Sequence, residues 1–157
     1  MEQINFRKAT INDIETLASL RTEFLIELLE PQTNASVTEL KKHLTGYLQQ
    51  SIPNGSYASY VAINANYIVA TGGMTIRYQP GNFKNLTGKV GYIMNMYTIP
   101  EFRKRGISTA ILNLLMAEAK ELGITALELH ATKEGESMYI KNGFKIHSEP
   151  TYRKYSI

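Results

Sequence analysis

One stretch of this sequence decides how the chain folds, and it reads Thr98-Ile-Pro-Glu-Phe-Arg-Lys-Arg-Gly-Ile-Ser-Thr109. A strand pattern precedes it and a run with helical spacing follows it, so the stretch is a strand–turn–helix connection. Three consecutive cations, Arg103 to Arg105, come immediately before Gly106. The first backbone N–H groups of a helix have no partner within the helix and carry partial positive charge, so they attract anions. Glycine has no Cβ to hold a phosphate away from the backbone. The stretch therefore predicts a site for a phosphate-rich ligand.

The size and composition of the chain predict one globular domain over residues 1–157, with a hydrophobic fraction of 43% and no internal repeat or linker. The absence of cysteine excludes disulfides, thiol catalysis and cysteine-bound metals. The three histidines, His43, His130 and His147, lie far apart without metal-ligand spacing, so no metal is expected.

The net charge and the apolar runs of the chain indicate which partners and which cellular location to expect. The net charge of +3 is mild and does not favour a nucleic-acid partner. The N-terminus carries an acid and lacks the apolar core of a signal peptide, and no apolar run reaches transmembrane length. We therefore expect a cytoplasmic location and no membrane partner.

The first half of the chain reads as a strand, two helices and a hairpin. After a strand over 2–8, Thr10-Ile-Asn-Asp13 matches a capping box and predicts a helix that runs to about Glu30, before Pro31. Ser36-Val-Thr-Glu39 matches a second capping box and predicts a second helix. Strands follow over 57–63 and 67–78, joined through residues 64–66. Gly72-Gly73 inside the second of these strands predicts a bulge or a close backbone approach.

The second half of the chain alternates strands and helices. The pattern predicts strands over 89–99, 124–131, 144–147 and 152–157, and helices over 107–122 and 135–142. The whole chain then has about seven strands and about four helices in an α/β (α+β) fold. A strand–helix–strand unit implies that strands 89–99 and 124–131 are parallel, whereas the hairpin implies antiparallel neighbours. We therefore expect a central mixed sheet, mostly antiparallel.

Two motifs in this order resemble those of the GNAT superfamily of acyl-CoA-dependent N-acetyltransferases. The run Arg103-Lys-Arg-Gly106-Ile-Ser108 resembles that family's Arg/Gln-x-x-Gly-x-Gly/Ala motif, with the small residue Ser108 in place of the usual glycine or alanine. The run Tyr139-Ile-Lys-Asn-Gly143-Phe144 is similar to the family's Tyr-x-x-x-Gly-Phe. The resemblance is strongest over residues 91–144 and implies a GNAT-like fold whose two parallel strands splay apart. It also implies acetyl-CoA as the co-substrate and makes a homodimer an expected state.

The resemblance further implies which residues bind acetyl-CoA. The turn and helix start contribute Arg103, Lys104, Arg105, Gly106, Ile107, Ser108 and Thr109. The backbone of Met96, Tyr97 and Thr98 is expected to lie against the pantetheine arm. Thr132 stands where many members have an asparagine that touches this arm, and its hydroxyl can still donate or accept a hydrogen bond.

The chemistry of acetyl transfer needs an oxyanion donor and a proton donor for the departing thiolate. By resemblance, the backbone N–H of Met96 is the oxyanion donor and Tyr139 is the general acid. A phenol with a pKa of about 10 stays protonated at neutral pH and can protonate the CoA sulfur. The competing interpretation is that Tyr139 only packs the short helix on which it lies.

A general base is not assigned. Many family members place a glutamate on the strand before the turn, but residues 89–99 contain no carboxylate. Asn95 is the one polar side chain in the middle of that strand and can orient a water or the acceptor amine. His130 has a suitable ordinary pKa, but a lone histidine on a strand is more often a hydrogen-bonded packing residue. Glu23, Glu27 and Glu30 share one helix face, which is typical of a solvated surface or of a site that attracts a cationic amine.

The leading hypothesis is an acetyl-CoA-dependent N-acetyltransferase that acts on a primary amine of a small molecule or peptide. The alternative is a non-catalytic acyl-CoA-binding or regulatory domain, which the missing carboxylate motivates. Nucleic-acid binding through Arg103 to Arg105 is a third reading, but one cationic turn does not form a basic stripe.

Overall fold

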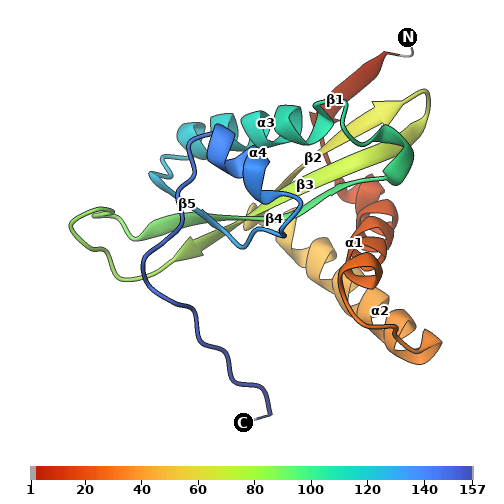
Figure 1. The fold of residues 1–157 in the computed structure, drawn as a ribbon, viewed down its shortest axis with the longest axis horizontal. Coiled ribbons are helices and arrows are strands. Elements are labelled where there is room, and N and C mark those ends of the chain that lie inside the picture. The colour runs from red at the N-terminus through yellow and green to blue at the C-terminus, as the bar shows by residue number, and fades with distance from the viewer. Residues whose placement is uncertain (1–2, 157) are drawn as a thin grey trace.

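A five-stranded sheet with helices on both faces makes up the fold in the computed structural model, which describes residues 3–156 (Figure 1). The strands are β1 Ile4–Lys8, β2 Tyr57–Asn64, β3 Tyr67–Tyr78, β4 Lys89–Thr98 and β5 Ala126–Leu129. The helices are α1 Ile14–Leu28, α2 Asn34–Ser51, α3 Ile107–Glu121 and α4 Glu136–Lys141, with short 3-10 helices at Ile11–Asp13 and Pro100–Phe102. In the part of the chain described, no helix is long and apolar enough to cross a membrane.

The strands lie in the order β1-β2-β3-β4-β5, antiparallel except for the β4–β5 pair, which is parallel. Helices α1 and α2 cover one face and α3 and α4 the other, as Figure 1 shows. Each face has its own apolar core. The larger core packs α3 on the sheet through Ile111, Leu112 and Leu115, which are fully buried. The smaller core holds α1 through Leu17 and Ala18. The predicted mixed, mostly antiparallel sheet with its parallel pair is therefore confirmed.

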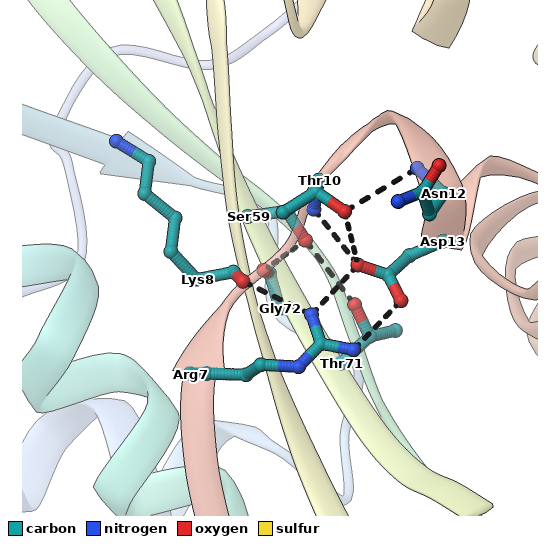
Figure 2. A network of polar contacts seen from close by, with 8 residues as sticks. All are labelled: Arg7, Lys8, Thr10, Asn12, Asp13, Ser59, Thr71 and Gly72. Atoms are coloured by element: carbon teal, nitrogen blue, oxygen red, sulfur yellow. Dashed lines mark hydrogen bonds and ion pairs between the residues drawn. The ribbon is translucent and has the colours of Figure 1, made fainter.

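The beginning of α1 is fixed to the first strand by a polar network (Figure 2). Arg7 of β1 donates two hydrogen bonds to the Asp13 carboxylate, at 2.7 and 2.8 Å. The Thr10 backbone N–H donates to the same carboxylate, and the Thr10 hydroxyl accepts from the Asn12 N–H. The capping box predicted at Thr10–Asp13 is thus confirmed. Because a buried carboxylate with three donors holds a fixed position, the direction of α1 over the sheet is fixed as well.

A β-bulge interrupts the pairing of β3 with β4. Asn95 and Met96 of β4 together lie opposite Gly72 of β3, and Asn95 takes a left-handed conformation with φ 57°. A Cβ at Gly72 would stand 2.4 Å from the Met96 sulfur, and one at Gly73 would stand 2.0 Å from the Tyr57 hydroxyl oxygen. The Gly72-Gly73 pair therefore provides both features that were predicted for it, the bulge and the close approach.

The parallel strands β4 and β5 pair over only four positions, from Val90 with Ala126 to Ile93 with Leu129. Beyond Ile93, β4 continues to Thr98 with β3 on one side and no strand on the β5 side among the residues described. The predicted splay is confirmed, and it leaves one backbone edge of β4 open.

Two details of the sequence prediction were wrong. Residues 144–147 and 152–156 form no strand, and Ile157 lies outside the described residues. Phe144 packs on the core, but the large side chains beyond it are exposed, with Ile146 at 82%, Tyr152 at 88% and Tyr155 at 79%. They form no apolar face against the sheet, which has five strands rather than seven. The second helix begins at Asn34, because the Thr33 hydroxyl accepts from the Ser36 N–H and caps the helix earlier than the predicted box at Ser36–Glu39. The first helix ends at Leu28, close to the predicted end at about Glu30.

Candidate active site

A cleft of about 560 Å³ opens where β4 and β5 diverge. Helix α1 forms one wall of the cleft, the end of β5 and helix α4 form another, and β4 forms the floor. Eight of the residues predicted from sequence to take part in binding or catalysis lie in its lining: Asn95, Met96, Tyr97, Thr98, Arg103, Ser108, Thr132 and Tyr139. Residues from three separate parts of the chain thus meet in one cavity.

The floor of the cleft contains the bulge. Asn95 and Met96 take no partner in the ladder with β3, and β5 has already ended its pairing at Ile93. The backbone around Met96 is therefore available for a ligand, as an oxyanion donor must be. The Asn95 amide nitrogen donates to the Tyr57 hydroxyl at 2.8 Å, and its oxygen is buried without a partner among residues 3–156.

The turn before α3 has two residues in left-handed conformation, Lys104 with φ 60° and Gly106 with φ 77°. Gly106 is the N-cap residue, so no side chain caps the first N–H groups of α3. Ile107 is buried and anchors the helix start in the core, while the Ser108 hydroxyl hydrogen-bonds the Thr98 hydroxyl at 2.9 Å. Thr109 is half-buried in the first turn of the helix. The helix start therefore has the open N–H groups that bind anions.

The cations of this turn have different surroundings. Arg103 donates from Nε to the Thr98 carbonyl at 2.8 Å and from Nη2 to the Glu27 carboxylate at 2.6 Å. Arg105 donates to the Glu101 carbonyl and stacks on the Phe102 ring. Arg103 lines the cleft but is held on the α1 side, so it would have to exchange Glu27 for a phosphate in order to bind one.

Glu27 has a second donor in the cleft, the Tyr97 hydroxyl. The hydrogen bond from Tyr97, reinforced by Arg103, holds the pKa of Glu27 below its usual value. Burial and the neighbouring Glu27 raise the pKa of Tyr97 to about 12. Glu27 is therefore an ionised, fully engaged carboxylate. Glu23 and Glu30, which share its helix face in the sequence pattern, are exposed and do not line the cleft.

On the α4 side, Tyr139 is buried, with 8% of its surface exposed, and its ring packs edge-on against Phe144 with centroids 5.8 Å apart. Burial raises the pKa of Tyr139 to about 12, so the phenol is protonated at neutral pH. The Tyr139 hydroxyl has no hydrogen-bond partner within residues 3–156. The Thr132 hydroxyl accepts from the Gly135 N–H at 3.2 Å and shapes the turn into α4. The second motif thus fixes the ring of Tyr139 by packing and leaves its hydroxyl free.

His130 follows β5 and lines the cleft, where its Nδ1 hydrogen-bonds the Tyr92 hydroxyl. His130 is exposed, and its ring also contacts the Tyr92 ring, with centroids 5.6 Å apart. The imidazole and carboxylate side chains of the cleft lining are thus His130, Glu27 and Glu134, and Glu27 is already engaged by Tyr97 and Arg103.

Arg21 is the site residue that the sequence prediction missed. It lines the cleft from α1 together with Phe24, whose ring centroid is 5.6 Å from its guanidinium carbon. A signal was present in the sequence: Leu17, Arg21 and Leu25 follow one another at helical spacing, so a cation interrupts the apolar face of this helix.

The acetyltransferase (GNAT) family matches residues 21–144 of this chain. The chain is also 30% identical over 126 residues to YedL, an uncharacterized N-acetyltransferase of Escherichia coli strain K12, with 75% of this chain and 77% of YedL covered.

Solved structures that resemble nearly the whole chain include the following two. One is a predicted acetyltransferase with acetyl-CoA from Clostridium acetobutylicum, with a TM-score of 0.89, 36% identity and coverage of 97% of this chain and 96% of that one. The other is a GCN5-related N-acetyltransferase from Ralstonia eutropha JMP134, with a TM-score of 0.87, 26% identity and coverage of 98% and 100%.

Proposed function

The chain belongs to the acetyltransferase (GNAT) family, and on that premise we propose that it transfers the acetyl group of acetyl-CoA to a primary amine of a small molecule or peptide. The observation that carries the proposal is the cleft itself, which is lined by the open edge of β4, by Ser108 in the first turn of α3 and by Tyr139.

Acetyl-CoA is the second substrate in this proposal. The N–H groups at Gly106 to Thr109 bind the pyrophosphate, because they lack partners and lie at the positive end of the α3 dipole. The open edge of β4 at Met96 to Thr98 pairs with the pantetheine amides as a neighbouring strand would. The relative from Clostridium acetobutylicum supports this choice, since its structure contains acetyl-CoA.

The reaction forms a bond from the amine nitrogen to the acetyl carbonyl carbon and breaks the carbon–sulfur bond. The Met96 backbone N–H donates to the oxygen that becomes negative during the attack. Tyr139 gives its proton to the departing sulfur, which its high pKa allows because the phenol stays protonated at working pH. The amine must lose a proton in the same reaction.

His130 is the proton acceptor that best suits this step. No carboxylate lies on β4, and Glu27 is engaged by Tyr97 and Arg103. Hydrogen bonding to Tyr92 orients the His130 ring, and the exposed side chain can pass the proton on to water.

The test measures thiol release from acetyl-CoA with a panel of amines, together with acetyl-CoA binding by calorimetry. The proposal expects acetyl-CoA binding that Gly106→Asp weakens, since a carboxylate would then face the phosphates. It also expects transfer to at least one amine. Absence of acetyl-CoA binding would overturn the proposal. Tight binding without transfer to any amine would instead favour a non-catalytic acyl-CoA-binding domain.

A further inference from the structure

A side pocket of about 230 Å³ adjoins the cleft on the α1 and α2 side of the sheet. Its walls are largely apolar and come from Leu17, Leu44, Leu48 and Met94, with Tyr47 and Tyr57 adding hydroxyls. Arg21, Met94 and Asn95 line both the side pocket and the cleft. The side pocket therefore opens toward the cleft beside the bulge of β4, and Arg21 stands at the junction.

Arg21 has no carboxylate partner among residues 3–156. Its surroundings are the Phe24 ring and the phenols of Tyr57 and Tyr92, and burial lowers the pKa of its guanidinium although these phenols act in the opposite direction. Burial also raises the pKa of Tyr57 to about 12, so Tyr57 is neutral at neutral pH and offers no counter-charge. A half-buried guanidinium thus keeps its charge without a partner.

The other charged side chains in the lining leave this charge uncompensated. Glu27 and Arg103, which also line the cleft, pair with each other. Glu134 and Arg153 line the opposite side, from the segment before α4 and from the C-terminal segment. In the side pocket, Arg21 is the one charged residue of the described lining. The acceptor end of the cavity is therefore positive.

An unpaired cation in a poorly hydrated place is destabilising, and a protein avoids it unless a ligand supplies the partner. The planar guanidinium offers paired donors that match a carboxylate or a phosphate. Resting on the acetyl transfer proposed above, we propose that the acceptor is an anionic amine, one that carries a carboxylate or a phosphate group. Arg21 binds the anionic group, the apolar part of the acceptor occupies the side pocket, and the amine lies at the bulge.

The test uses pairs of amines that differ only in the anionic group. Leucine is compared with 3-methylbutylamine, phenylalanine with 2-phenylethylamine, and O-phosphoethanolamine with ethanolamine. The wild-type protein should acetylate the anionic member of at least one pair about 100-fold better in kcat/KM, mostly through KM, as expected of a charged hydrogen-bonded pair. Comparison of the two amino acid pairs with the phosphate pair shows whether the site prefers a carboxylate or a phosphate. Equal or better use of the neutral member in every pair would overturn the inference.

The second part of the test compares the variants Arg21→Met and Arg21→Lys with the wild-type protein. Arg21→Met should remove the preference for the anionic amine, because it lowers kcat/KM for the anionic member of a pair far more than for the neutral member, and should leave acetyl-CoA binding unchanged. Its Tm should stay the same or rise, because the variant removes an unpaired buried charge. Arg21→Lys should keep part of the preference. A fall in Tm together with an equal loss on both members of a pair would mean that Arg21 is structural, and would overturn the inference.

Calorimetry with the CoA-bound protein separates the two proposals. Binding of an anionic amine that Arg21→Met abolishes, without acetyl transfer, supports the inference and contradicts the proposed function. Transfer to neutral amines alone supports the proposed function and contradicts the inference. If no anionic amine of the panel either binds or reacts, the inference fails.

Discussion

The Arg103 guanidinium donates to the Glu27 carboxylate at 2.6 Å, and so links the cationic turn to helix α1 across 76 residues of sequence. Both side chains are about two-fifths exposed, but the Tyr97 hydroxyl, which is buried, donates to the same carboxylate. The Glu27 carboxylate therefore joins three elements that line the cleft: α1, β4 and the turn before α3.

Glu27→Gln should lower the free energy of unfolding by about 1 kcal/mol, because it weakens two charge-assisted hydrogen bonds at a partly exposed position. Urea denaturation at neutral pH measures this loss. Glu23→Gln is the matched control, since Glu23 is an exposed acid of the same helix. Equal effects of the two variants would contradict a joining role for Glu27.

Asp13 should make stability depend on acid pH. The hydrogen bonds from Arg7 hold the pKa of Asp13 below its ordinary value of 3.8, so the folded protein binds this proton less readily than the unfolded chain does. The contribution of Asp13 is then complete above about pH 4 and lost as pH falls through the lower folded pKa. Urea midpoints between pH 2.5 and 7 should fall less steeply on acidification in Asp13→Asn. Parallel curves for the two proteins would contradict this.

Gly106→Ala should weaken acetyl-CoA binding about tenfold and lower the free energy of unfolding by about 1 kcal/mol, since φ is 77° and a Cβ disfavours that conformation. Gly123→Ala is the control: Gly123 has φ 68° and, as at Gly106, an added Cβ would meet no atom of the described residues within 4 Å. It should lose similar stability without a change in acetyl-CoA affinity. An equal loss of affinity in both variants would show that the turn has no special role.

Tyr139→Phe should lower kcat about 100-fold with little change in acetyl-CoA affinity, because it removes the proton donor and keeps the packing on Phe144. Since burial raises the pKa of Tyr139 to about 12, the wild-type rate should show no fall from ionisation of this phenol below about pH 10. The exposed Tyr67→Phe serves as the control. An unchanged kcat in Tyr139→Phe would leave this residue a packing role only.

The variants Asn95→Gly and Asn95→Val distinguish the role of the bulge conformation from the role of the Asn95 side chain. Glycine accepts the left-handed conformation at this position, whereas valine does not, so Asn95→Val should be less stable than Asn95→Gly by about 2 kcal/mol. Asn95→Gly should still bind acetyl-CoA but have a higher KM for the amine. Thermal unfolding and steady-state kinetics measure the two effects. Better acetyl-CoA binding by Asn95→Val than by Asn95→Gly would contradict the importance of the bulge.

Much of the fold was predictable because its signals are local. The capping box at Thr10–Asp13, the glycine pair at 72–73 and the turn before α3 each depend on a few neighbouring residues. The strands predicted over 144–147 and 152–157 failed for the opposite reason. A short strand needs a neighbour to pair with, and the sequence pattern of a segment does not reveal whether one is within reach.

The phosphate end of the candidate site was predictable from motifs, but its amine end was not. The partners of Arg103, one on β4 and one on α1, result from tertiary packing and cannot be read from the cationic run. The same holds for Arg21, which is notable only because the packing of α1 and α2 leaves it without a counter-charge. Sequence spacing identifies a helix face, whereas the three-dimensional structure reveals which charges remain unpaired.

Helix α1 is held at both ends by carboxylates, Asp13 on Arg7 of β1 and Glu27 on Arg103 and Tyr97. Arg21 lies between these two anchors. Helix α1 is thus already ordered when the protein has folded. Binding of a ligand to Arg21 therefore costs little additional conformational entropy. Both anchors also depend on ionised carboxylates. Strong acid should therefore loosen the two ends together, and so turn a preorganised wall into an adaptable one.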